Sequence, residues 1–205
     1  MPLTNFNVVL VGQNFPVESI NVADFSFRSR RFKELLRIPV AVQAENEWSM
    51  IQVFPDRFQA EVKKPDRLDV QCEGIAEVVT TFLEYVGKRT ITAVGHNALW
   101  VIPGTADSRS EVVGQFLNAS AIAASVGDAS ADLSLTFQRG DAVVRVNIPS
   151  SQEGDVALNF NFHREIRDGQ VMSAVEMLQD SLQCSKEIAE KIETPVVAAA
   201  EQVTP

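Results

Sequence analysis

Cysteine and histidine are scarce in this sequence. Cys72 and Cys184 are the only cysteines among 205 residues, and His96 and His163 are the only histidines. Two cysteines this far apart form neither a metal-ligand pattern nor a disulfide framework. Two histidines exclude a three-histidine metal site, and mixed sites that use carboxylates are the alternative left open. We therefore expect no metal and no cofactor.

Long apolar runs are also missing. No window approaches the ~18 apolar residues of a membrane-spanning helix, and the first residues lack the basic segment and apolar stretch of a secretory signal. The formal net charge of -9 repels the phosphate backbone of nucleic acids and anionic lipids. These absences predict a cytoplasmic protein that binds neither nucleic acid nor membrane.

The common catalytic motifs are absent as well. The sequence has no phosphate-binding G-x-x-x-x-G-K-S/T or G-x-G-x-x-G, no G-x-S-x-G nucleophile turn and no H-E-x-x-H zinc helix. No pair of carboxylates is placed where acid–base chemistry would be expected. No catalytic residue is therefore predicted.

Apolar residues are plentiful and periodic. They make up 45% of the chain against 22% charged residues, which is the balance of a globular protein. In the first half, alternation predicts strands and helical spacing predicts two helices. The expected elements are a strand at 3–11, a helix at 28–36, strands at 38–45, 47–54, 57–63 and 67–72, and a helix at 75–86.

The second half repeats this order with fewer strands. A long strand at 89–102 contains Gly95, which suggests a bulge or bend. The further elements expected are a helix at 109–124, alternating strands at 133–138, 142–148 and 156–163, and a helix at 170–192. Residues 193–205 contain two prolines and no periodicity, and we expect a flexible tail there.

The predicted fold class is α+β, with a largely antiparallel sheet and helices packed on one face. Residues 1–87 and 88–192 would form two pseudo-duplicated β-α-β(3–4)-α halves. This order of elements resembles the TATA-binding-protein fold, in which a duplicated unit builds one curved antiparallel sheet. The resemblance is one of topology, so it implies a fold and transfers no functional residue.

Polar side chains alternate with apolar ones in the second-half strands and would share the solvent-facing side of the sheet. Amides and hydroxyls dominate this set, and charge is sparse. Such a face suits a ligand or a partner strand, and the alternative is an ordinary solvated face. The residues are Ser134, Thr136, Gln138, Arg145, Asn147, Asn159, Asn161 and His163.

These features predict a non-catalytic protein–protein interaction or assembly component of an intracellular complex, with a protein partner or self-association. The first alternative is a small-ligand-binding protein that uses a cleft between the halves, lined by Gly95, His96 and Asn97. The second alternative is an enzyme with an unrecognised site, for which His96 or His163 would be the residue to test.

Overall fold

A single antiparallel sheet of nine strands, in the order β4-β5-β6-β7-β1-β8-β11-β10-β9, forms the frame of the molecule. The computed structural model describes residues 1–86, 91–103, 133–149, 155–166 and 170–202. The strands are β1 (Leu3–Gly12), β4 (Lys33–Ile38), β5 (Ala41–Glu45), β6 (Ser49–Val53), β7 (Arg57–Val62), β8 (Ile91–Ile102), β9 (Leu133–Arg139), β10 (Ala142–Ile148) and β11 (Val156–Glu165). Strands β2 (Ser26–Phe27) and β3 (Arg30–Arg31) form a separate small hairpin.

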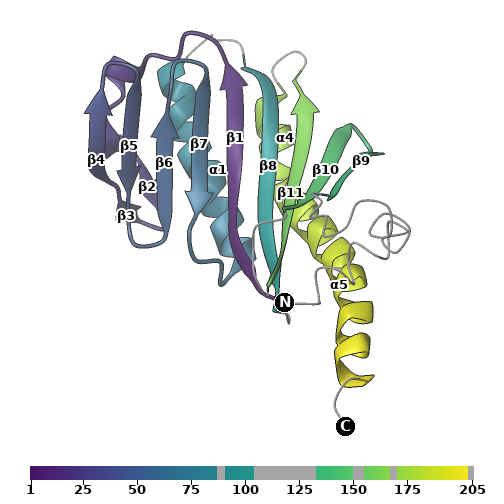
Figure 1. Ribbon diagram of the computed structural model, residues 1–205. Coiled ribbons are helices and arrows are strands. Elements are labelled where there is room, and N and C mark those ends of the chain that lie inside the picture. The colour runs from purple at the N-terminus through teal and green to yellow at the C-terminus, as the bar shows by residue number, and fades with distance from the viewer. Residues whose placement is uncertain (87–90, 104–132, 150–154, 167–169, 203–205) are drawn as a thin grey trace, which may run out of the picture.

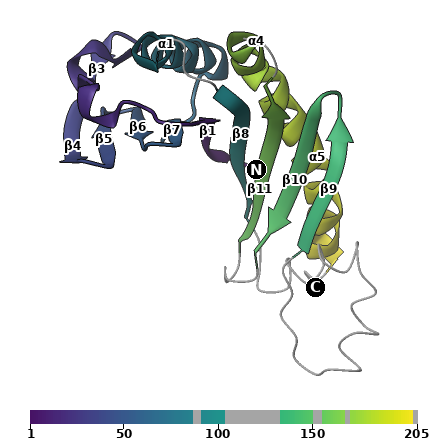
Figure 2. The same ribbon diagram turned by 90° about the horizontal axis from the view of Figure 1, so that it is seen from above.

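The α-helices are α1 (Leu68–Val86), α4 (Val171–Glu176) and α5 (Leu178–Gln202), and two short 3-10 turns lie at Val17–Ser19 and Val22–Asp24. Figure 1 shows the described α-helices behind the sheet. None of them covers the opposite face, which we call the open face. Seen from above in Figure 2, the sheet bends near β1 and β8, and the open face lies on the inside of the bend. None of the described helices is long and apolar enough to cross a membrane.

Strands β1 and β8 join the two halves of the chain at the centre of the sheet. They pair antiparallel from Asn5 opposite Leu99 to Val11 opposite Ala93. Strands β4 to β7 continue the sheet beyond β1, and β9 to β11 continue it beyond β8. The predicted α+β class with a large antiparallel sheet is confirmed.

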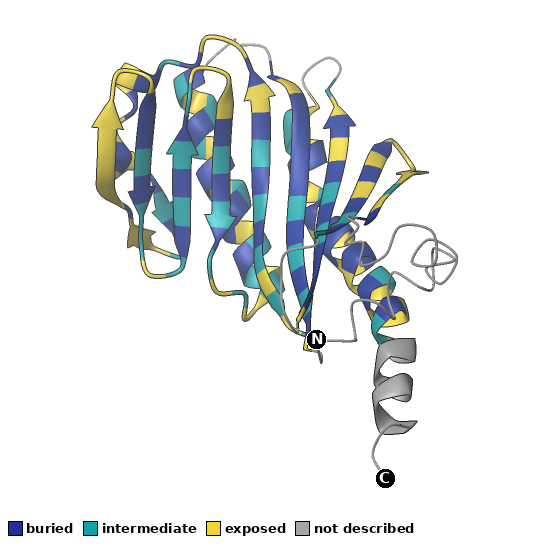
Figure 3. Ribbon diagram, in the orientation of Figure 1, coloured by how far each residue is buried: buried dark blue, intermediate teal, exposed yellow. Residues whose placement is uncertain are grey.

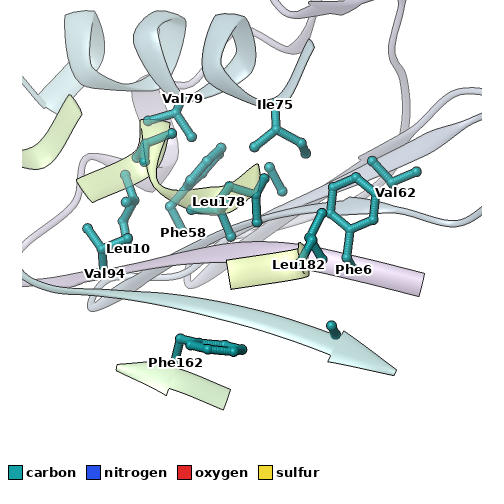
Figure 4. Packing of buried hydrophobic residues seen from close by; sticks show 14 of the residues in the cluster. Phe6, Leu10, Phe58, Val62, Ile75, Val79, Val94, Phe162, Leu178 and Leu182 are labelled. Carbon is teal, nitrogen blue, oxygen red and sulfur yellow. The ribbon is translucent and has the colours of Figure 1, made fainter. Parts of the chain in front are cut away.

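Aromatic rings fill the space between α1 and the sheet. The rings of Phe58 and Phe82 stack at 4.1 Å between centroids, and Phe15 meets Phe82 edge-on at 5.1 Å. Figure 4 shows Ile75 and Val79 of α1 above Phe58 and other core residues of the sheet. Burial of such rings contributes most of the stabilisation of a helix–sheet layer.

Gly74 lies inside α1 because another ring needs its space. A Cβ atom at this position would come within 2.8 Å of Cε2 of Phe27, which is fully buried. The glycine therefore allows the β2–β3 hairpin to pack directly on the helix, as the contacts between α1 and β2 show. The helix therefore begins before this glycine, at Leu68, and not at residue 75 as predicted.

The predicted helix at 28–36 is wrong. Arg28 and Ser29 have positive φ values of 52° and 61° and form the turn between β2 and β3. Residues Lys33–Ile38 then form the edge strand β4, paired with β5. A register shift between Glu34 and Leu36 adds one residue, and this irregularity produced the apparent helical spacing of the apolar residues.

The predicted strand at 67–72 is also wrong, because α1 already begins at Leu68. The Gln71 side chain explains the start: its amide oxygen accepts from the Asp66 backbone N–H, and its amide nitrogen donates to the Lys64 carbonyl. These bonds satisfy the chain just before the helix. Gln71 is buried, although alternation within the predicted strand had placed it on the solvent-facing side.

The bulge expected at Gly95 does not occur. Gly95 pairs in regular register with Val9 of β1 and His163 of β11. A Cβ atom there would meet only ordinary contacts, the nearest at 3.7 Å, so the strand passes through this position without distortion.

The other predicted strands are present with small shifts in their ends. The predicted last helix is divided at Met177 into α4 and α5, and α5 continues to Gln202, beyond its expected end at 192. The helix predicted at 109–124 lies outside the described residues.

Candidate interaction face

The open face of the sheet carries polar side chains in rows that cross the strands. Cross-strand pairing gives each row, because paired residues of neighbouring strands point to the same side. The middle row runs through Glu45, Met50, Glu61, Asn7, Asn97, Asn161, Arg145 and Thr136. A second row runs through Gln43, Gln52, Gln59, Val9, Gly95, His163, Val143 and Gln138, and a third through Asn5, Leu99, Asn159, Asn147 and Ser134.

Three asparagines of the middle row form a hydrogen-bonded ladder across the centre of the sheet. The Asn161 amide donates to Oδ1 of Asn97 at 2.6 Å, and the Asn97 amide donates to Oδ1 of Asn7 at 2.7 Å. Each primary amide has two N–H donors and an oxygen with two lone pairs. Among the described residues, the ladder uses one donor and one acceptor of Asn97, which leaves its second N–H and its second lone pair for another molecule.

Opposite charges adjoin the two ends of this ladder. Arg145 is registered beside Asn161, whose carbonyl oxygen is the free end, and Glu61 is registered beside Asn7, whose amide nitrogen is the other end. A cation next to a carbonyl and an anion next to an N–H group both favour this orientation of the amides. The charges of these neighbouring residues therefore match the direction of the ladder.

The open face is partly shielded from water although none of the described helices covers it. Asn7, Asn97, Asn161 and Gln59 are all half-buried, and Figure 3 shows the same intermediate class along the middle strands. Burial raises the pKa of Glu61 from its ordinary value, against the lowering effects of a hydrogen bond from Gln59 and the charge of Lys63. The bend of the sheet thus forms a shallow concave surface with reduced access to solvent.

Every residue that the sequence proposed for the polar face lies on this side. The third row contains Asn159, Asn147 and Ser134. The middle row contains Asn161, Arg145 and Thr136, and the second row contains His163 and Gln138. The structure places these residues together, and their role in an interaction remains a prediction.

Sequence reasoning missed the contribution of the first half to this face. Gln43, Gln52 and Gln59 occupy successive strands and pair with one another, and Asn7 begins the asparagine ladder. Their alternation with apolar residues was visible in the sequence. What was not visible was the strand order, which places β1 between β7 and β8.

Gly95, His96 and Asn97 do not line one cleft. Successive residues of a strand point to opposite faces, so Asn97 lies on the open face and His96 points under the helices, where it is 1% exposed. His163, the other histidine proposed for catalysis, is exposed on the open face. The two histidines therefore lie on opposite sides of the sheet and cannot act on one substrate.

His96 belongs to a buried polar cluster between the sheet and α5. Its Nδ1 lies 3.0 Å from the Ser181 hydroxyl and 3.2 Å from a guanidinium nitrogen of Arg164. The adjacent guanidinium carries N–H donors only, so Nδ1 acts as an acceptor. Burial, together with the positive charge of Arg164, lowers the pKa of His96 to about 3.

Arg164 is the only charged residue among the buried side chains of the described chain. Its Nε donates to Asp141 at 3.2 Å, and this carboxylate is largely exposed. The guanidinium therefore spans from the covered interior to the sheet margin. A cavity of about 250 Å³ opens there, lined by Arg139, Gly140, Phe162, Arg164, Met177, Asp180, Ser181, Gln183 and Cys184.

The two cysteines show no sign of nucleophilic activation. Burial is the main cause that raises the pKa of both thiols, to about 12 for Cys72. The thiolate is the reactive form, so both side chains are held in the unreactive state. Within the described part of the chain, no group of three or more histidine, cysteine or acidic side chains is arranged to hold a metal ion.

Comparison with known proteins adds no functional assignment. The sequence matches no protein-family model, and a search of curated proteins finds no significant match.

Proposed function

We propose that this protein is a non-catalytic interaction component of a cytoplasmic assembly, and that it binds an extended segment of a protein partner on its concave open face. The asparagine ladder carries this proposal. A side-chain amide offers the same donor and acceptor as a peptide group, so a surface of amides can bond to a polypeptide backbone without requiring a particular sequence.

The charge of the face supports the same choice of partner. The chain has a net charge of -9, yet the open face combines both signs. Lys63 pairs with Glu45 at 2.8 Å, and Arg145 and Glu61 stand at opposite ends of the ladder. A face of mixed charge gives little attraction for nucleic acid and suits an uncharged polar chain.

We also propose that the two halves are a duplicated unit with the strand order of the TATA-binding-protein type, in which the β2–β3 hairpin of the first half replaces the helix predicted at 28–36. The strand order supports this proposal: β7 lies beside β1 in the first half, β11 lies beside β8 in the second, and each half ends in a helix on the covered face. The open face corresponds to the concave side of that fold, although fold similarity alone assigns no ligand.

Site-specific photo-cross-linking in the native host tests the binding face. A photoreactive residue placed at Gln59 or Asn159 should cross-link one partner, because both positions lie on the open face. The matched control is the same residue at the exposed Glu77 of α1, on the helix layer. Adducts from Glu77 alone, or from none of the positions, would contradict the proposal.

The cross-linked partner segment then allows a quantitative test. We expect Asn97→Val to weaken binding of the synthetic segment about tenfold, because a bound chain would lose one or two hydrogen bonds at the centre of the face. The control Glu77→Gln should bind like the natural protein. Equal affinities for Asn97→Val and the natural protein would place the binding elsewhere.

A small-ligand function is the second candidate, and the cavity beside Arg164 and Ser181 favours it. Its position differs from the cleft expected at residues 95–97, since only His96 of that trio approaches the cavity, through its contacts with Arg164 and Ser181. Native mass spectrometry distinguishes the two functions. A bound small molecule that is lost in Arg164→Met would support ligand binding.

A further inference from the structure

Strand β4 forms one edge of the sheet and is exposed along its whole length, as Figure 3 shows. Most of the large apolar side chains that are exposed in the described chain lie on it or just after it: Leu35 at 49%, Leu36 at 44%, Ile38 at 43% and Val40 at 57%. Its outer edge has no strand partner among the described residues. An apolar edge of this kind is a template for pairing with another strand.

The pairing of β4 with β5 shows where its side chains point. Lys33, Leu36 and Ile38 are registered with Glu45, Gln43 and Ala41, and so belong to the open face. Glu34 and Arg37 are registered with Ala44 and Val42, and so belong to the helix face. Leu35 is the additional residue at the register shift.

This arrangement is self-complementary. When two copies of β4 lie antiparallel about a two-fold axis, one register places Glu34 opposite Arg37 of the second copy and Leu35 opposite Leu36 of the second copy. Lys33 then meets Ile38, and residues of the open face meet residues of the open face. A second register also pairs open-face residues with open-face residues. It places Arg37 of one copy opposite Arg37 of the other, where like charges repel.

We propose that a second copy of this chain pairs with β4 in the first of these registers and forms a two-fold dimer. The ion pair between Glu34 and Arg37 occurs twice across the axis, and the leucines cover one another at its centre. Because a two-fold contact uses the same edge of both copies, it closes and does not propagate into a fibre. The two open faces become neighbours on one side of a continuous sheet.

Charge reversal gives a test that depends on this register. Within one chain, Arg37 also pairs with Glu34 at 2.6 Å, so each single reversal alters both the chain's own pair and the dimer. In the Glu34→Arg homodimer, the new arginine at position 34 faces Arg37 of the second copy. In the Arg37→Glu homodimer, Glu34 faces the new glutamate at position 37 of the second copy. Both homodimers therefore place like charges opposite each other. A mixture of the two variants restores opposite charges at both contacts, although neither chain regains its own ion pair.

The experiment is sedimentation equilibrium of each variant alone and of the equimolar mixture. We expect the natural chain to dimerise, each reversal to weaken dimerisation about tenfold or more, and the mixture to regain the natural affinity. Glu77→Arg is the control for net charge and should dimerise normally. Circular dichroism confirms that each variant is folded, and Leu36→Lys provides a second variant, expected to be monomeric.

A natural chain that stays monomeric at every concentration would overturn the proposal. A dimer that tolerates both reversals, or a mixture that shows no recovery, would assign the contact to another surface. The charge-reversal result is independent of partner binding on the open face, because Glu34 and Arg37 belong to the helix face.

Discussion

His96 shows how a polar residue can occupy the covered side of this sheet. The ring accepts hydrogen bonds from Ser181 and Arg164, and it does so only when it is neutral at Nδ1. Protonation would place a second positive charge beside a buried guanidinium. The folded state therefore resists protonation of a side chain that the unfolded chain protonates readily.

This resistance predicts a pH dependence of stability. Above about 6.5, the ordinary pKa of His96, the ring is neutral in both states and contributes no slope. Between about 6.5 and about 3 the unfolded chain binds a proton that the folded chain does not. The free energy of unfolding should therefore fall as the pH falls through this window, by up to about 1.4 kcal/mol per pH unit from this residue.

The measurement is urea unfolding across that pH window, with His96→Gln for comparison. Glutamine retains a side chain that can bond to Ser181 and removes the titration. The difference in stability between the two proteins should narrow, or change sign in favour of the variant, as the pH is lowered. Two parallel curves would show that His96 does not titrate as the structure requires.

At the scale of elements, period-two alternation predicted most of the sheet correctly, and its failures have local causes. Residues 67–72 alternate between apolar and polar, but Leu68, Cys72, Ile75 and Val79 also continue a helical stripe. The decision between the two patterns depends on Gln71, whose amide binds the backbone of residues 64 and 66. The periodicity of the sequence gives no indication of these two hydrogen bonds.

Period-two alternation also predicted part of the open face. Alternation indicates which residues of one strand share a side, so the second-half set was placed on a common face. It does not indicate which strands are neighbours. Asn7 and Asn97 are 90 residues apart in the chain, and only the pairing of β1 with β8 brings their amides into contact.

The contact between α1 and the β2–β3 hairpin gives a prediction for Gly74. In an ordinary helix interior, Gly→Ala stabilises by about 1 kcal/mol. Here the new methyl group would displace the buried ring of Phe27, so we expect Gly74→Ala to destabilise the protein by about 1–3 kcal/mol.

A double-mutant cycle with Phe27→Leu checks this explanation by chemical denaturation. A smaller side chain at residue 27 should recover part of the loss, giving a coupling of about 1 kcal/mol between the two sites. Additive effects would mean that the glycine is needed for another reason.

At the scale of the whole molecule, the β1–β8 pairing joins the halves into one sheet, and the buried apolar side chains form one cluster. We therefore expect the described elements of both halves to unfold together, in a single cooperative transition. Independent domains would instead unfold separately.

Each half contains one tryptophan, which makes the test direct. In the first half, the Trp48 ring lies beside the guanidinium of Arg28. In the second half, Trp100 lies on β8 and its indole N–H donates to the Ser185 hydroxyl. In Trp100→Phe the fluorescence reports on the first half, and in Trp48→Phe on the second. Within each variant, the fluorescence transition should coincide with the loss of circular dichroism, and a separation of the two curves would show independent halves.

The aligned amides of the middle row give the open face a direction. From Arg145 to Glu61, each asparagine donates toward the next in the same sense, so the local dipoles add and do not cancel. Asn97 both donates and accepts within the row, so reversal of the row would require the amides to rotate together. A molecule bound along the row would therefore meet a carbonyl oxygen of Asn161 at the β11 end and amide N–H groups of Asn7 at the β1 end, so the two ends of the row select opposite hydrogen-bonding groups.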